Sequence, residues 1–207
     1  MSITIWERIE GARQRWNVLE HTFYVRWSAG ELSREELADY SGQYRHATKA
    51  IAALSDEVAL AAPEAERGEL RRHAEEEAAH VSLWDGFVDE VGGSRSAEPT
   101  SETESCTREW TEPDGYLPGL VRLYAIESAQ PAISRTKLEG LRAHYGVDEG
   151  RGDAYFRVHL QADHEHAAED RRLIERHLAG ADEDRLVAAA ESAYRANWAL
   201  LDGVTRS

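Results

Sequence analysis

Two histidines and an aspartate in the C-terminal third of the chain have the spacing of a metal-binding motif. His159, Asp163 and His166 are separated by four and three residues, and at about 100° per residue these positions lie along one stripe of a helix. Two imidazoles and a carboxylate directed at one point are suitable ligands for a transition metal. A solvated charged face is the alternative, but apolar neighbours predict a partly buried helix, where charged groups need partners or a metal.

A second candidate motif lies in the glutamate-rich segment RRHAEEEAAHVSLWDGF. Two aromatic residues follow His80 at four and seven positions, which places it on the packed face of a predicted helix. Glu77 precedes His80 with the Glu-x-x-His spacing of di-iron carboxylate bundles. We nevertheless prefer Glu76, because a residue four positions earlier lies over the turn beneath His80. His73 is a further candidate, although the two arginines before it favour an exposed position.

An isolated acidic residue supplies the third candidate motif. Glu127 is the only acid between Gly115 and Glu139, and its neighbours are apolar. A carboxylate in such surroundings must be satisfied, either by a structural ion pair or by a metal that it bridges. Pro131 should bend this helix, and Lys137 lies close to the same face as Glu127.

Composition and charge exclude several classes of partner. The 207 residues carry a formal charge of −15 and only two lysines, so nucleic acid and anionic membranes are improbable partners. No apolar run approaches the roughly 20 residues needed to span a bilayer, and the start of the chain lacks a signal-peptide core. We therefore expect a soluble cytoplasmic protein. The single cysteine, Cys106, excludes a disulfide within the chain.

The pattern of apolar residues predicts an all-α protein. These residues recur at three- and four-residue steps and no β-type alternation persists, so we predict a compact bundle of about seven helices in one domain over residues 1–207. Ser33 and Glu36 form a predicted capping box. The polar stretch 94–113 is predicted to be a loop. The predicted helices are 3–27, 34–60, 64–91, 117–145, one from just after Gly152 to about 178, and 182–204.

Four stretches of the chain resemble a known family. They are LEHTFYVRWSAGELSREELADY, EEEAAHVSLWDGF, YAIESAQPAISRTKLEGLRAHYG and YFRVHLQADHEHAAEDRRLIE. Together they resemble the haem-oxygenase-like di-iron oxidases of the TenA and PqqC superfamily, and most closely the CADD-like synthases of para-aminobenzoate (4-aminobenzoate). The resemblance implies a haem-oxygenase-like fold with two iron ions, or one iron and one manganese. By position, the implied metal ligands are Glu76, His80, Glu127, His159, Asp163 and His166.

The same resemblance implies a self-sacrificing oxidation that uses dioxygen and a reductant. Tyr24 corresponds to the tyrosine that is consumed, Tyr40 to a second tyrosine of the site, and Lys137 to the amine donor. Two departures from the family pattern matter. The spacing in EEEAAH is compact where the family has a longer insertion, which leaves the choice between Glu76 and Glu77 open. A glutamine that follows the helical glutamate by two residues in the family stands one position later here, at Gln130.

Other functions stay open from the sequence. An oxidase of the same kind could act on an external small molecule, and a TenA- or PqqC-like enzyme would need no dimetal centre. A TenA-type reaction requires a cysteine nucleophile, for which Cys106 in the predicted loop is poorly placed. His21 or His46 could bind haem, and a non-enzymatic metal- or partner-binding bundle is a further alternative. We expect a homodimer, since this is the commonest oligomer.

Overall fold

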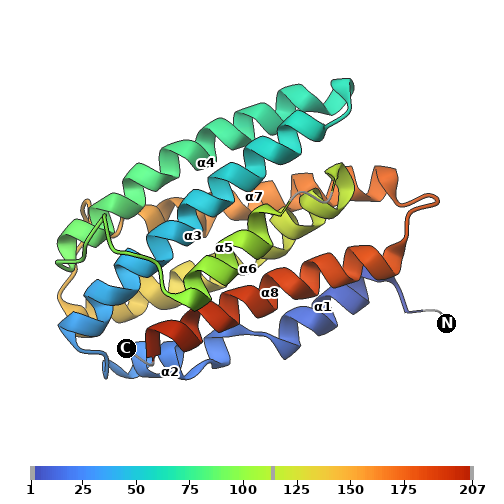
Figure 1. Cartoon of the computed structure of the whole chain (residues 1–207). Helices are drawn as coiled ribbons and strands as arrows, with labels where there is room; N and C mark the ends of the chain where they lie inside the picture. Colours follow the sequence, from blue (N-terminus) through green and yellow to red (C-terminus); the bar gives the residue numbers. More distant parts are fainter. Residues whose placement is uncertain (1–2, 113–114, 206–207) are drawn as a thin grey trace.

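The computed structural model describes residues 3–112 and 115–205 of the chain. Within these ranges it contains eight α-helices and no strand, which confirms the predicted all-α class and adds one helix to the expected number (Figure 1). A short 3-10 turn precedes α2, and a π-helical turn, Leu141–Tyr145, follows α6. The helices are α1 (Ile5–Arg15), α2 (Thr22–Ala29), α3 (Arg34–Ala61), α4 (Glu64–Glu90), α5 (Ser101–Thr111), α6 (Tyr116–Gly140), α7 (Ala154–His177) and α8 (Glu183–Thr205).

The five long helices form the body of the bundle (Figure 1). Helix α3 packs along α4, α6 packs along α7, and α4 also contacts α7. Helices α4 and α7 run in opposite directions, so the start of α4 and the end of α7 lie at the same end of the molecule. These contacts bring the three predicted ligand helices, α4, α6 and α7, together in the interior.

The predicted first helix is wrong in one respect, because the structure divides residues 3–27 into two helices. Helix α1 ends at Arg15, and the side chain of Asn17 accepts a hydrogen bond from the Leu19 amide in the 3-10 turn that follows. His21 then begins α2 by accepting the Phe23 amide on Nδ1, at 3.0 Å. Asparagine and histidine side chains that cap backbone amides in this way compete with a continuous helix.

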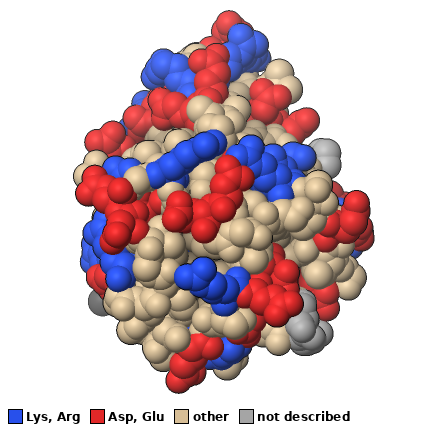
Figure 2. All heavy atoms as spheres, turned by 90° about the vertical axis from the view of Figure 1, so that its left-hand side faces the viewer, with Lys and Arg blue, Asp and Glu red and all other residues tan. Residues whose placement is uncertain are grey.

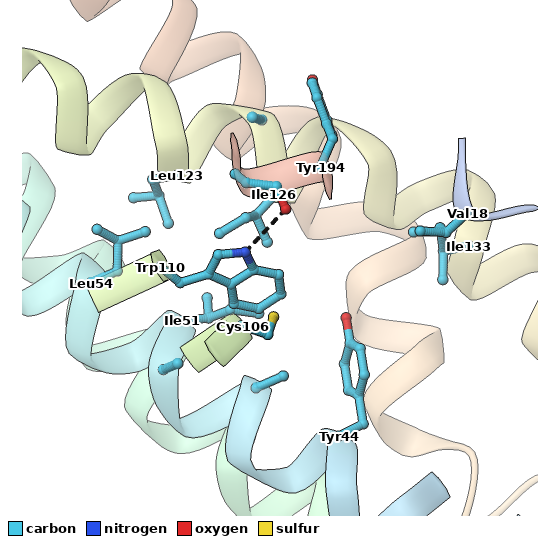
Figure 3. Close-up of a cluster of buried hydrophobic side chains, with 14 of the residues drawn as sticks. Val18, Tyr44, Ile51, Leu54, Cys106, Trp110, Leu123, Ile126, Ile133 and Tyr194 are labelled. Atoms are coloured by element: carbon cyan, nitrogen blue, oxygen red, sulfur yellow. Dashed lines mark hydrogen bonds between the residues drawn. The ribbon is translucent and has the colours of Figure 1, made fainter. Parts of the chain in front are cut away.

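The predicted loop at 94–113 is also wrong over most of its length, because residues 101–111 form α5. Thr100 caps this helix by accepting the Thr103 amide. Trp110 and Cys106 are buried with Ile51 of α3 and Ile126 of α6, and the Trp110 indole donates a 3.1 Å hydrogen bond to the Ala193 carbonyl (Figure 3). Of the three buried residues on this short helix only Cys106 and Trp110 are apolar, which leaves little periodic signal in the sequence. Residue 113 lies outside the described ranges.

The surface is highly charged but of mixed sign. On the end of the bundle shown in Figure 2, basic side chains are interspersed with acidic ones, and several form ion pairs, such as Arg45 with Asp85 at 2.6 Å. Among the described residues, no helix combines the length and the apolar character needed to cross a bilayer.

Candidate metal centre

The motif on α7 lies where the sequence predicted, on the buried face of its helix. His159, Asp163 and His166 are only 2%, 0% and 8% exposed. The ring of His159 is oriented by its Nδ1, which lies 2.7 Å from the Tyr155 carbonyl oxygen and donates to it. This hydrogen bond leaves Nε2 of His159 buried and without a hydrogen-bond partner among the described residues. A histidine held in this manner is prepared to bind a metal through Nε2.

Helix α4 presents three residues to the same region: His73, Glu77 and His80, all buried. Glu77 Oε1 lies 2.9 Å from His80 Nδ1. The side chain of Glu76, in contrast, is 57% exposed and reaches only the edge of the cluster, where Oε2 lies 3.0 Å from His166 Nε2. The geometry therefore favours Glu77 over the preferred Glu76 as an interior ligand.

His73 was expected to be exposed, and this expectation is wrong. The ring of His73 is buried and lies on that of His166, with 4.0 Å between the ring centroids. A sequence signal for His73 exists. The spacing His-x3-Glu-x2-His from His73 to His80 repeats the His-x3-Asp-x2-His spacing of α7, and both place their three members on one helical stripe.

Glu127 completes the cluster from α6. Its side chain is buried, and Oε1 lies 2.7 Å from His73 Nε2. Neither carboxylate oxygen makes a well-aligned hydrogen bond to the described residues. Glu127 does not form the alternative structural ion pair with an arginine, because the basic group next to its carboxylate is the imidazole of His73.

The donor atoms form two groups that share one residue. The first group comprises His73, Glu77, Glu127 and His166, and the second comprises Glu77, His80 and His159. Within each group, one potential ligand atom from every residue lies within 4.8 Å of those of the others. Glu77 belongs to both, as a carboxylate that bridges two cations would. Asp163 lies against the first group, with Oδ1 3.8 Å from His166 Nδ1.

The charge of the cluster fits cations. Four carboxylic acids are buried in and beside the two groups: Glu77, Glu127, Asp163 and Asp170. Burial, reinforced by the neighbouring carboxylates, raises the pKa values of Glu127, Asp163 and Asp170 well above the ordinary range. All six oxygens of these three residues lack a well-aligned hydrogen bond within the described chain. Fully ionised, the four acids would carry a charge of −4, which two divalent cations would balance.

Two of the imidazoles, those of His159 and His166, favour the neutral state that metal binding requires. Burial lowers the pKa of His159 to about 4, and burial together with the adjacent His73 lowers the pKa of His166. Burial alone would raise the pKa of Glu77, but the hydrogen bond from His80 and the surrounding imidazoles outweigh it and lower the pKa. Neutral imidazoles beside an ionised carboxylate form a suitable donor set for iron or manganese.

Next to this cluster lies a buried amine. Lys137 is 0% exposed, and its Nζ has no hydrogen-bond partner among the described residues. Burial lowers its pKa well below that of an ordinary lysine, so the amine favours its neutral form. Five aromatic rings surround Nζ, with centroids 4.5–5.8 Å away: Tyr24, Tyr40, Tyr44, Trp84 and Phe156.

Helix α2 holds the backbone of Lys137 in place. The Trp27 indole donates a 3.3 Å hydrogen bond to the Lys137 carbonyl oxygen. This approach requires Gly140, because a Cβ there would lie 2.4 Å from Trp27 Nε1. The small residue thus allows α2 and α6 to pack closely enough for Tyr24 and Lys137 to share one pocket.

Neighbouring rings connect this aromatic pocket with the ligand cluster. The hydroxyl oxygens of Tyr24 and Tyr40 are 3.4 Å apart, and the Tyr40 ring lies 6.0 Å from that of Trp84. The Trp84 ring lies 4.9 Å from that of Tyr155, which stacks on His159 at 3.8 Å. Along this path, three aromatic rings, those of Tyr40, Trp84 and Tyr155, therefore separate Tyr24 from the nearest candidate ligand, His159.

Three residues named in alternative interpretations have other roles in the structure. Cys106 is buried and its pKa is raised by burial, which disfavours the thiolate that a nucleophile needs. His21 accepts the Phe23 amide on Nδ1 and places Nε2 3.2 Å from Asp202, while His46 Nε2 bonds to the Ala97 carbonyl.

Gln130 donates a 3.2 Å hydrogen bond to the Tyr44 hydroxyl and so borders the aromatic pocket.

Comparisons with known proteins agree with this geometry. A family model described as iron-containing redox enzyme matches residues 44–198. The 4-aminobenzoate synthase of Chlamydia trachomatis is 31% identical over 201 residues, which cover 91% of this chain and 87% of that protein. These matches confirm the resemblance that the four sequence stretches indicated.

Solved structures share the fold. A TenA homologue from P. horikoshii OT3 superposes with a TM-score of 0.81 at 17% identity, covering 99% of both chains. A CADD-like protein of unknown function from Nostoc punctiforme gives a TM-score of 0.68 at 19% identity, covering 96% of this chain and 97% of that one. The haem-oxygenase-like, TenA-like fold predicted from the sequence is therefore confirmed.

Proposed function

This chain belongs to the family of iron-containing redox enzymes, and we propose that it is a dioxygen-dependent dimetal oxidase that makes 4-aminobenzoate from its own side chains. In this proposal Tyr24 is consumed and Lys137 supplies the nitrogen. The metals are two iron ions or one iron and one manganese. Because the protein would be a reactant, each chain would react only once.

One observation carries the proposal. A cluster of buried histidines and carboxylates, rich in atoms without hydrogen-bond partners among the described residues, is connected through the rings of Tyr155 and Trp84 to a buried, unpaired lysine. Buried ionisable groups are costly to a fold unless they are paired, and they are concentrated at functional sites. Similarity to a 4-aminobenzoate synthase supports the same conclusion.

The two donor groups define which residues would hold the metals. His73, Glu77, Glu127 and His166 would hold one ion, and Glu77, His80 and His159 the other. Bound iron would supply the reduction of dioxygen, with electrons from an external reductant. Asp163 borders the first group and, once ionised beside a bound cation, would add negative charge that helps to hold divalent ions.

The aromatic pocket would prepare Lys137 as a nitrogen donor. Its rings exclude water and hydrogen-bonding partners from Nζ, so the amine keeps its lone pair available. A lysine made neutral by burial is nucleophilic at neutral pH. The ring of Tyr24 lies within this pocket, with its centroid 5.8 Å from Nζ.

The same aromatic side chains would connect Tyr24 with the metal ligands. An electron removed from Tyr24 can pass by way of Tyr40, Trp84 and Tyr155 to His159, because each ring or hydroxyl contacts the next. Direct contact between Tyr24 and a metal is then unnecessary. The hydroxyl of Tyr40, 3.4 Å from that of Tyr24, is positioned to exchange a proton with it.

Substitution of the two reacting residues tests the proposal. In iron-loaded protein supplied with reductant and air, Tyr24→Phe and Lys137→Met should each abolish 4-aminobenzoate while metal content stays at the wild-type level. Tyr194→Phe removes a hydroxyl from a buried tyrosine on α8, outside the pocket, and should leave the product unchanged. Product from the Tyr24→Phe variant would contradict the proposal and favour an external substrate.

A further inference from the structure

A line of polar side chains continues from the ligand cluster to the surface between α4 and α7. On α7, Asp170 and His177 follow His166 at four and eleven residues, close to the stripe that contains the ligands. On α4, Glu66 lies seven residues before His73, again on the inward face. Because the two helices are antiparallel, the start of α4 and the end of α7 lie together at the right-hand end of the bundle in Figure 1. Near these helix ends, Glu66 and His177 are in contact.

Asp170 is the unexplained member of this line. Its side chain is 1% exposed, and neither carboxylate oxygen has a hydrogen-bond partner among the described residues. The carboxylate is close to that of Glu127, since the charge of Glu127 contributes, after burial, to raising the pKa of Asp170. Asp170 is nevertheless absent from both donor groups. Asp170 therefore has the chemistry of a cation ligand but belongs to neither of the two proposed metal-binding groups.

The outer end of the line is closed by the side chains of Glu66, Tyr116 and His177. The Glu66 carboxylate accepts a 2.7 Å hydrogen bond from the Tyr116 hydroxyl and lies 3.0 Å from His177 Nε2. The His177 side chain is 33% exposed. Burial, the hydrogen bond to Glu66 and the charges of Glu66 and Asp170 raise the pKa of Tyr116, so both carboxylates lie in the neighbourhood of its hydroxyl. The succession from solvent inwards is thus His177, Glu66, Asp170 and Glu127.

We propose that divalent cations enter the buried centre along this seam, passing His177 and Glu66 and using Asp170 as a transit ligand before they reach Glu127 and His73. The inference rests on the proposed metal centre. Carboxylates spaced along a closed, low-dielectric path attract cations and replace part of the hydration shell that they lose. Asp170 would bind the ion in passage, whereas the two donor groups would retain it.

Uptake of Co²⁺ by the metal-free full-length protein tests the route without any turnover. Visible absorption of bound Co²⁺, followed by stopped flow, gives the rate of uptake, and its final amplitude gives the stoichiometry. Asp170→Asn should slow uptake roughly tenfold, because the amide cannot ionise to bind the cation in passage, and should leave the final stoichiometry unchanged. Glu165→Gln removes an exposed carboxylate from the same helix and should not alter the rate.

A second variant should change the rate of Co²⁺ uptake in the opposite direction. Poor folding would slow uptake in both variants and so could not produce this pair of results. His177→Ala removes the ring that closes the outer end and should accelerate uptake, while Glu66 keeps its hydrogen bond from Tyr116. Equal rates for Asp170→Asn and the wild type, or slower uptake in both variants, would overturn the route but leave the metal centre standing. Reduced stoichiometry in Asp170→Asn would make Asp170 a permanent ligand and also overturn the transit role. If the wild type bound no Co²⁺, the proposed centre itself would fail.

Discussion

At the scale of single residues, the structure distinguishes side chains that look equivalent in the sequence. Glu76 and Glu77 are adjacent acids before the same histidine, yet the Glu77 side chain is buried in the cluster and that of Glu76 is 57% exposed. The i−4 and i−3 positions both lie near His80 on a helix, so spacing alone could not separate them. The packing of α4 against α7 decides which carboxylate points inwards.

Metal content should separate these two glutamates. Glu77→Gln should lose most of the bound metal, because the shared carboxylate belongs to both donor groups and an amide lacks the charge that holds cations. Glu76→Gln should retain nearly the wild-type content, since its side chain only reaches the edge at His166. Elemental analysis after dialysis of both variants provides the measurement. Equal retention by the two variants would refute the role of Glu77.

The buried Lys137 should lower the free energy of unfolding of the protein. Its pKa is far below that of an ordinary lysine because of burial, whereas in the unfolded chain the value is about 10.4. Between these two pKa values the unfolded state binds the extra proton, so the stability of the wild type rises with pH in this window. Lys137→Met fills the same space without an ionisable group.

The substitution Lys137→Met should therefore increase the free energy of unfolding by about 1–3 kcal/mol at pH 7. This advantage should shrink as the pH rises towards about 10.4, where the unfolded lysine also loses its proton. Urea denaturation of both proteins at several pH values is the measurement. A difference that is independent of pH would show that Lys137 is not held neutral in the fold.

At the scale of elements, amphipathic patterns predicted the long helices, and local side-chain chemistry caused the errors. Helix α3 begins at the predicted capping box, in which Ser33 accepts the Glu36 amide, and α6 ends in the π turn before Gly146, whose φ of +67° suits glycine. The break near Asn17 and the polar helix α5 were missed. In both places a few specific hydrogen bonds and buried contacts, rather than a periodic apolar pattern, determine the structure.

Helix α5 should contribute substantially to stability although its sequence resembles a loop. Trp110 is fully buried and donates to the Ala193 carbonyl, so Trp110→Ala should lower the free energy of unfolding by about 3–5 kcal/mol. Ser105→Ala, an exposed position on the same helix, should change it by less than about 0.5 kcal/mol. Chemical denaturation compares the two. Similar small effects would mean that α5 does not anchor α3 and α8.

At the scale of the whole molecule, two costly features are buried side by side. One is a cluster of carboxylates and imidazoles, and the other is an unpaired lysine among aromatic rings. The bundle supports both because long helices on all sides supply a large apolar core. Sequence motifs predicted most of the buried residues that lie together in the candidate site, because each helix places them at helical spacing. The ring contacts that join Tyr24 to the cluster depend on the packing of α2, α3, α4 and α7, which no local pattern specifies.

The origin of the product atoms shows whether Tyr24 is the source of 4-aminobenzoate. Protein prepared with ring-labelled tyrosine would be loaded with iron and exposed to reductant and air, and both the released 4-aminobenzoate and the peptide containing residue 24 would be examined by mass spectrometry. If Tyr24 is consumed, labelled 4-aminobenzoate should appear in no more than one equivalent per chain, with a matching loss of mass at Tyr24. Unlabelled product, or repeated turnover of an added small molecule while Tyr24 stays intact, would contradict the consumption of Tyr24.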